Sequence, residues 1–184
     1  MGEWAVITLK KEWQGSILDI GGGGEGVIGR LYGEQVLAID NCQEELDEAP
    51  GGFAKALMDA TNLSFADASF DHVSFFFSLM FMNREEQRKA VMEAARVLKP
   101  GGEMHIWDCD IVSAYPQPFC VAVDVQLPGE QIHTTYGIGK QDGQDEASIT
   151  RMCLDAGLRL LSRSAETVGF SLRLQKESST AGNH

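Results

Sequence analysis

Residues 17–33 read ILDIGGGGEGVIGRLYG, and this run constrains the fold more than any other part of the chain. A short apolar stretch ends in a cluster of glycines, and a second apolar stretch with helical character follows. Glycine lets the backbone turn sharply and pass close to a bound molecule, because it has no side chain to collide with it. The run therefore predicts a buried strand, a ligand-binding turn and a helix, which together begin an α/β domain.

The glycines of this turn fit two ligand-binding patterns. Gly21, Gly23 and Gly26 match G-x-G-x-x-G, the dinucleotide pattern, in which a pyrophosphate lies at a helix N-terminus. Asp19 followed by the first two of these glycines matches the opening of D-x-G-x-G instead. A carboxylate would repel a pyrophosphate and would attract a cationic ligand. The position of Asp19 therefore favours the second pattern.

From residue 15 to residue 108 strand-like apolar runs alternate with helix-like runs, which is typical of a parallel sheet buried between helices. The clearest helix covers 84–98, where Asn83 can form a capping box with Glu86 and Lys99-Pro100-Gly101-Gly102 ends the pattern. The sequence thus predicts a doubly wound α/β fold with a mostly parallel sheet and helices on both faces. The expected strands are 16–20, 35–40, 53–59, 72–78, 103–108, 158–164 and 168–176, and the other expected helices are 26–33, 42–49 and 146–157.

The alternation breaks after the fifth expected strand. Residues 121–140 predict a β-hairpin that turns at Pro128-Gly129-Glu130. We expect this hairpin to belong to an insertion over 109–145 that covers the substrate and excludes water. A length of 184 residues is suited to one domain, so we expect a single domain over 1–184 that ends in a loose polar tail at 176–184.

Charge and composition narrow the classes of partner. A net charge of −12 argues against a nucleic-acid-binding surface, and the apolar runs are too short to span a bilayer. The N-terminus lacks the pattern of a signal peptide. Four cysteines lie far apart with no C-x-x-C, which indicates reduced thiols. We therefore expect a cytoplasmic protein that acts on a small molecule, with no nucleic-acid or membrane partner.

Acidic residues also end the next two expected strands. Asp40 ends the second, where a carboxylate can accept ribose hydroxyls, and Asp59 ends the third. Taken in order, ILDIGGGGEG, VLAID, LMDATNLSFADASFDHV and RVLKPGG resemble the class I S-adenosylmethionine-dependent methyltransferases, in the branch of the ubiquinone/menaquinone methyltransferases and many small-molecule enzymes. The resemblance implies a Rossmann-like fold, S-adenosyl-L-methionine as cofactor, and methyl transfer to a small molecule by in-line displacement. One departure is that Glu25 takes the place of the family's third glycine.

The resemblance also implies the cofactor contacts. Asp19 and the glycine turn would line the methionine part, Asp40 would accept from the ribose, and Asp59 with the amide of Ala60 would meet the adenine. Two residues after the fourth strand would lie near the transferring methyl group. The implied cofactor-binding residues are Asp19, Gly21, Gly23, Gly24, Asp40, Asp59, Ala60, Ser78 and Leu79.

Catalytic candidates come from the insertion, because ligands of open α/β sheets lie at the carboxyl ends of the strands. Tyr115, His133 and Tyr136 are the candidates, although each could instead pack a turn or lie on a solvated hairpin. Asp108 and Asp110 could bind a divalent metal, but such a site needs several oxygen ligands and the loop after the fourth strand supplies no acid. We therefore expect no metal site.

Three further residue groups have a structural and a functional interpretation. His72 and His105 lie within strand patterns, which favours structural roles for both. The apolar run Met80-Phe81-Met82 follows the fourth strand and favours an uncharged or aromatic methyl acceptor. The exposed edge of the hairpin could pair with a second subunit, which would make a homodimer.

The sequence leaves two other functions open. A non-catalytic S-adenosylmethionine-binding protein would have the same motifs, since no catalytic base stands out. An NAD(P)-dependent oxidoreductase would bind its dinucleotide at the G-x-G-x-x-G pattern, but the carboxylate of Asp19 disfavours this alternative. The acceptor, and whether oxygen, nitrogen or carbon is methylated, does not follow from the residues.

Overall fold

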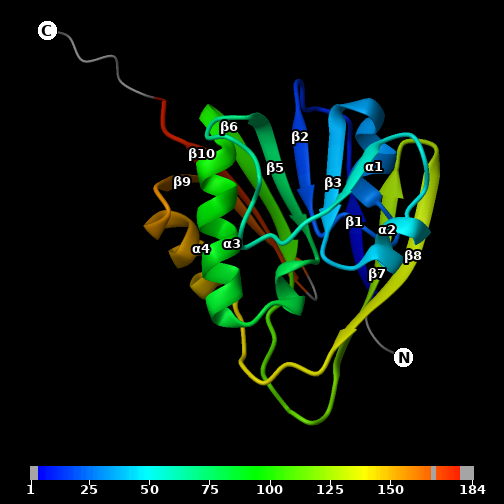
Figure 1. Ribbon diagram of the computed structural model, residues 1–184. Coiled ribbons are helices and arrows are strands. Elements are labelled where there is room, and N and C mark those ends of the chain that lie inside the picture. The colour runs from blue at the N-terminus through cyan, green and yellow to red at the C-terminus, as the bar shows by residue number, and fades with distance from the viewer. Residues whose placement is uncertain (1–3, 167–168, 179–184) are drawn as a thin grey trace, which may run out of the picture.

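The computed structural model describes residues 4–166 and 169–178, and it is built around one twisted seven-stranded sheet (Figure 1). The strand order is β4-β3-β2-β5-β6-β10-β9. The first five strands of this order run parallel, and β10 and β9 complete the sheet in antiparallel pairings. This confirms the predicted Rossmann-like α/β sheet, while most of the expected tail lies outside the described residues. The strands are β2 (Ile17–Ile20), β3 (Val36–Asp40), β4 (Ala54–Leu57), β5 (Phe70–Phe76), β6 (Leu98–Asp108), β9 (Leu158–Glu166) and β10 (Gly169–Lys176).

The central strand β2 explains why the opening motif is so apolar. It pairs with β3 on one side and β5 on the other, and all four of its residues are buried. A strand covered on both faces needs a continuous apolar run rather than an alternating one. Because the five strands are parallel, their carboxyl ends meet at one edge of the sheet, where the glycine turn begins.

One face of the sheet is covered by α3 (Arg84–Val97) and α4 (Glu146–Asp155). The predicted capping box is present: the Asn83 side chain accepts from the N–H of Glu86 at 2.9 Å, and Glu86 accepts from the N–H of Asn83 at 2.8 Å. The helix ends at Val97 and the chain continues directly into β6. Residues 99–102 therefore belong to a strand and not to a separate loop. Pro100 favours an extended backbone at Lys99, the residue before it, which is consistent with this strand.

The other face carries α1 (Val27–Tyr32) and a second, three-stranded sheet (Figure 1). This small sheet has the order β1-β7-β8, with β1 (Trp4–Thr8) parallel to β7 (Phe119–Leu127) and β7 antiparallel to β8 (Glu130–Ile138). Alternate residues of β7 are buried in one hydrophobic cluster with α1. The hairpin is thus one layer of the core, anchored by a strand, β1, that the sequence analysis did not predict. The remaining elements are α2 (Gln43–Glu48), η1 (Gly33–Gln35) and η2 (Leu79–Phe81).

Cys42, Cys109, Cys120 and Cys153 are all free, as their spacing indicates. Over residues 4–166 and 169–178, every helix is too short or too polar to cross a bilayer.

Candidate functional site

A cavity of about 870 Å³ lies at the carboxyl ends of β2 to β5. Its walls come from the glycine turn, the ends of β3 and β4, the segment after β5, and β8 of the small sheet. The volume is in the range of small-molecule and cofactor sites, and the position is where open α/β sheets bind ligands. The cavity is the site that the sequence motifs predict, with a contribution from the hairpin.

The glycine turn, residues 21–26, uses its own backbone amides to hold its shape. The N–H groups of residues 21–24 all donate hydrogen bonds within the protein. A phosphate site at such a turn needs these donors free, so the turn is poorly suited to a pyrophosphate. The bonds run from Gly21 and Gly22 to the carbonyl of Ile39 at 2.8 and 3.0 Å, from Gly23 to Oδ2 of Asp40 at 3.2 Å, and from Gly24 to the carbonyl of Glu45 at 2.7 Å.

Packing explains why the turn needs glycine. Gly21 has a φ of 75°, and a Cβ at this position would lie 2.4 Å from Cβ of Ser78. Ser78 is itself fixed, because its hydroxyl donates to the carbonyl of Ile20 at 2.7 Å. Gly24 and Gly26 also have positive φ values, 60° and 58°. These two glycines therefore supply the left-handed backbone around Glu25, the residue that departs from the family pattern.

Asp19 lies beneath the turn and is 2% exposed. Its Oδ1 accepts a hydrogen bond from the Ser74 hydroxyl at 2.7 Å. Burial raises the pKa of the Asp19 carboxyl to about 7, a rise that the Ser74 hydrogen bond opposes and the charge of Asp40 reinforces. A cation in the cavity would favour the ionised form of Asp19, whereas an anion would oppose it.

More carboxylates line the same end of the cavity than the motif predicts. Glu25, Glu45 and Glu48 join Asp19 and Asp40 there. Partial burial raises the pKa of Glu45, and the surrounding carboxylates raise it further. This end of the cavity, the acidic end, is therefore strongly negative. The run of acids in α2, directly after β3, was the available signal for Glu45 and Glu48.

Asp59, the predicted adenine contact, also lines the cavity. Oδ1 of Asp59 accepts from the N–H and the hydroxyl of Thr61, each at 2.8 Å, and these bonds lower the pKa of Asp59. Ala60 follows it in the cavity wall. Eight of the nine predicted cofactor residues line the cavity, and Leu79 instead lies fully buried in the core.

The other end of the cavity, the aromatic end, is built from Phe76, Phe77, Phe81, Met82 and Tyr136. Tyr136 stacks on Phe77 with ring centroids 5.1 Å apart and planes 13° apart. Phe77 has a φ of 50°, which is unusual for a bulky residue, and strain of this kind clusters at functional sites. Burial and then the charge of nearby acids, Glu25 first, raise the pKa of Tyr136 well above its usual value.

The other two catalytic candidates lie elsewhere. Tyr115 is 57% exposed in the loop between β6 and β7, and His133 has Nδ1 3.6 Å from Oδ1 of Asp124. Neither lines the cavity. His133 and Tyr136 are three residues apart on β8, and side chains at an odd spacing on a strand point to opposite faces. The geometry therefore favours Tyr136 among the three.

Asp108 and Asp110 hold the segments after β6 together. Asp108 is fully buried, and its carboxylate accepts from the Gln144 side chain at 2.6 Å and from the N–H of Met80 at 3.1 Å. Burial raises the pKa of Asp108 to about 6. Asp110 accepts from the N–H of Glu146 at 2.8 Å. Both acids therefore accept hydrogen bonds that hold the start of α4 and the segment before it in place.

The fold and the cavity together define a nucleoside-binding α/β domain, and comparison with known proteins identifies its family. A methyltransferase domain family matches residues 18–106. The O-methyltransferase resE of Aspergillus sclerotiorum is 32% identical over 157 residues, which are 79% of this chain and 55% of that protein. The ubiquinone/menaquinone biosynthesis C-methyltransferase UbiE of Desulfotalea psychrophila is 30% identical over 146 residues, 73% of this chain and 55% of that protein.

A solved structure agrees with this assignment at the level of the fold. An S-adenosylmethionine-dependent methyltransferase of Methanosarcina mazei has a TM-score of 0.63 and 18% identity, covering 93% of this chain and 95% of that one. The chain belongs to the class I S-adenosylmethionine-dependent methyltransferases, in the quinone-methyltransferase-like branch. S-adenosylmethionine is the cofactor of this family, and it carries a sulfonium and an ammonium but no phosphate. The acidic end of the cavity and its engaged amides fit that cofactor. The chain spans 55% of the length of the two curated relatives.

Proposed function

We propose that the protein transfers the methyl group of S-adenosylmethionine to an uncharged aromatic or apolar small molecule. The observation that carries the proposal is a single cavity with an acidic end and an aromatic end. When bound, the cofactor supplies an electrophilic methyl group, so the protein has to align the two reactants and exclude water. The names of the curated relatives, an O-methyltransferase and a quinone C-methyltransferase, support a phenol- or quinol-like acceptor.

In this proposal the acidic end holds the cofactor. Asp40, whose Oδ1 and Oδ2 already fix the backbone at Cys42 and Gly23, has lone pairs left to accept from ribose hydroxyls. Asp59 and Ala60 would meet the adenine. Asp19 and the glycine turn would hold the methionine part, whose positive charges the surrounding carboxylates attract.

The aromatic end would hold the acceptor against the methyl group. Phe77 and Tyr136 form one stacked wall, and Phe81, 49% exposed, lies toward the opening. The raised pKa keeps the Tyr136 phenol protonated at neutral pH, and its hydrogen bond to the Glu25 side chain holds the ring in place against Phe77. Tyr136 would therefore position the acceptor, and the acceptor's own acidity would decide whether a base is needed.

The test is turnover with a graded panel of acceptors. The protein is incubated with S-adenosylmethionine and phenols, reduced quinones, aliphatic amines and amino acids, and S-adenosylhomocysteine and methylated products are measured by mass spectrometry. We expect both products with a phenol or a reduced quinone and neither with the charged compounds. Cofactor binding without turnover on any aromatic compound would favour the non-catalytic alternative, and preferential methylation of the charged compounds would overturn the assignment of the aromatic end.

A further inference from the structure

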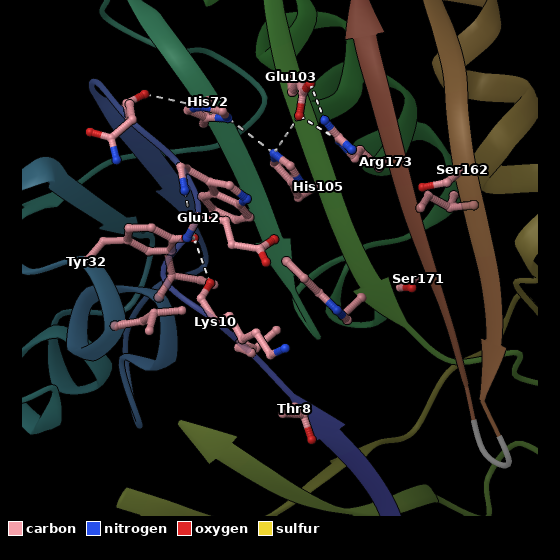
Figure 2. Close-up of a pocket in the computed structure, with 17 residues that line it drawn as sticks. Thr8, Lys10, Glu12, Tyr32, His72, Glu103, His105, Ser162, Ser171 and Arg173 are labelled. Atoms are coloured by element: carbon pink, nitrogen blue, oxygen red, sulfur yellow. Dashed lines mark hydrogen bonds and ion pairs between the residues drawn. The ribbon is translucent and has the colours of Figure 1, made fainter. Parts of the chain in front are cut away.

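A second cavity, of about 540 Å³, lies on the face of the sheet that carries α1 (Figure 2). The loop 9–14, α1 and strands β5, β6, β9 and β10 line it. It has no lining residue in common with the cavity at the carboxyl ends of the strands. Its chemistry is therefore separate from methyl transfer and needs its own explanation.

Three metal-binding side chains meet in this cavity. His72 on β5 is paired with Glu103 on β6, and His105 is two residues further along β6, so all three point to the same face. Nδ1 of His72 lies 3.2 Å from Nε2 of His105, and that nitrogen lies 3.5 Å from Oε2 of Glu103. Figure 2 shows the three side chains converging. Within residues 4–166 and 169–178, this is the one group of three or more potential metal ligands so placed.

The spacing matches what a tetrahedral metal requires. Two imidazole nitrogens at 2.0–2.1 Å from a tetrahedral Zn²⁺ are about 3.3 Å apart. The observed separation of 3.2 Å between the His72 and His105 nitrogens is nearly the same. All three ligand atoms lie within 4.8 Å of one another, so a metal could bind with only small side-chain movements.

The neighbouring hydrogen bonds hold the ligands in orientation. Nε2 of His72 lies 3.1 Å from the carbonyl of Gln14 and donates its proton there, which leaves Nδ1 facing the other two ligands. Arg173 holds Glu103 through two hydrogen bonds of 2.8 Å, one to each carboxylate oxygen. Outer-shell partners of this kind orient the ligands of metal sites in proteins.

The site is also shielded. The Trp13 ring stacks on His105 with centroids 3.9 Å apart, and it also stacks on Tyr32, with centroids 4.7 Å apart. The Tyr32 hydroxyl accepts from the N–H groups of Glu12 and Trp13 and thereby fixes the loop. His105 is only 5% exposed, while the cavity leaves one side of the cluster open.

We propose that His72, Glu103 and His105 bind Zn²⁺ through Nδ1, Oε2 and Nε2, with a water in the fourth position toward the cavity. Imidazole ligands suit zinc, and three protein ligands with one open position are a common zinc arrangement. In the metal-free protein Nε2–H of His105 donates to Nδ1 of His72. When the metal binds, that proton moves to Nδ1 of His105 and both rings stay neutral. The metal would join β5 to β6 and stabilise the folded state.

The charges around the cluster are compatible with this proposal. Neutral imidazole is the form of histidine that binds a metal, and the carbonyl of Gln14 accepts the Nε2 proton that His72 keeps in that form. Glu103 supplies one negative charge, and Arg173 remains its outer-shell partner. Glu12 and Lys10 also line the cavity, one of each sign.

The proposal is tested with protein stripped of metal by a chelator and then titrated with Zn²⁺ or Co²⁺. We expect one equivalent to bind, the melting temperature to rise, and the cobalt form to show the intense visible bands of a tetrahedral site without a thiolate charge-transfer band. The last feature separates this site from binding at the exposed Cys120. His72→Asn and Glu103→Gln each remove a ligand, so each should weaken Zn²⁺ binding by more than the roughly 10–100-fold that loss of an outer-shell partner costs.

His133→Asn is the matched control, because it makes the same change at a histidine that also faces a carboxylate, Asp124 at 3.6 Å. It should leave Zn²⁺ affinity unchanged. Should either ligand variant fail to fold, the imidazole ¹⁵N signals of the unmodified protein decide: His72 Nδ1 and His105 Nε2 shift on addition of Zn²⁺ if the proposal holds. Unshifted signals, or equal Zn²⁺ affinity in His72→Asn and the control, would overturn it.

Discussion

The two ends of the large cavity are built on different principles. The acidic end is made of short consecutive segments at the tips of β2, β3 and β4, and hydrogen bonds hold each of its parts in place. The aromatic end is assembled from β5, η2 and β8, which are far apart in the sequence, and ring packing holds it together. The acidic end is a fixed site for one ligand. The shape of the aromatic end depends on the hairpin β7–β8, which lies outside the part of the sequence that contains the motifs.

This difference has a functional consequence. A cofactor that does not change needs a rigid binding site, and a site fixed by backbone hydrogen bonds provides one. Loops and added strands can vary between related proteins without disturbing the sheet, so the aromatic end can change with the acceptor. We therefore expect substitutions at the acidic end to affect every reaction of the protein, and substitutions at the aromatic end to affect the choice of acceptor.

The largest effect is expected for Gly21→Ala at the acidic end. The new Cβ would meet Ser78 at 2.4 Å on a backbone with a φ of 75°, so strain and overpacking should together cost about 2–6 kcal/mol of unfolding free energy. Urea denaturation measures the loss, and cofactor titration should show no binding. Gly51→Ala is the control, because a Cβ there meets nothing within 4 Å. Similar stabilities for the two variants would contradict the packing argument.

The second prediction concerns the pH dependence of the cofactor-free protein. The pKa of Asp19 is about 7 when folded and 3.8 when unfolded, so between these values the folded state binds more protons. The free energy of unfolding should therefore fall as the pH rises from about 4 to 7. At about 1.36 kcal/mol per pKa unit, Asp19 accounts for a fall of about 4 kcal/mol. Asp108, with a pKa raised to about 6, acts in the same direction.

Asp19→Asn removes the titrating group while keeping an acceptor for Ser74. Denaturation from pH 5 to pH 8 should show this variant gaining stability relative to the unmodified protein as the pH rises. Asp47→Asn, at an exposed position of α2, is the matched control. A parallel pH profile for Asp19→Asn and the unmodified protein would mean that Asp19 is ionised throughout.

A third prediction isolates the ribose contact. Asp40→Ala should weaken S-adenosylmethionine binding by about 1.5–3 kcal/mol, because it removes charge-assisted hydrogen bonds to the ligand and the acceptor for the Gly23 N–H. Isothermal titration calorimetry measures the change, with Asp47→Ala as the control that should bind normally. Unchanged affinity in Asp40→Ala would place the ribose elsewhere.

The smallest effect is expected at the aromatic end. Tyr136→Phe keeps the stack on Phe77 and should alter cofactor affinity little, whereas Tyr136→Ala loses a pair contact of about 0.5–1.5 kcal/mol beyond its buried area. With an accepted phenol, the alanine variant should raise KM for the acceptor while the cofactor Kd stays constant. Equal losses of cofactor and acceptor binding would mean that the two ends are not independent.

The same contrast explains how much the sequence revealed. Most strands, the capping box at Asn83 and eight residues that line the large cavity follow from local patterns, because each depends on neighbours within one short segment. The sequence WAVIT of β1 favours a strand, but its parallel pairing with β7, over a hundred residues away, leaves no local signal. Glu45 lines the cavity only because α2 packs beside the glycine turn. His72 and His105 appeared to be isolated structural residues until the sheet register brought them together.

The acidic end and the engaged amides of the glycine turn suit the large cavity to a cationic nucleoside and not to a phosphorylated one. Calorimetric titration of the unmodified protein with S-adenosylmethionine and, in parallel, with NADH tests it most directly. We expect saturable binding of one equivalent of S-adenosylmethionine and no measurable heat of binding from NADH. Tight NADH binding, or S-adenosylmethionine binding that survives Asp19→Asn and Asp40→Ala together without loss, would contradict it.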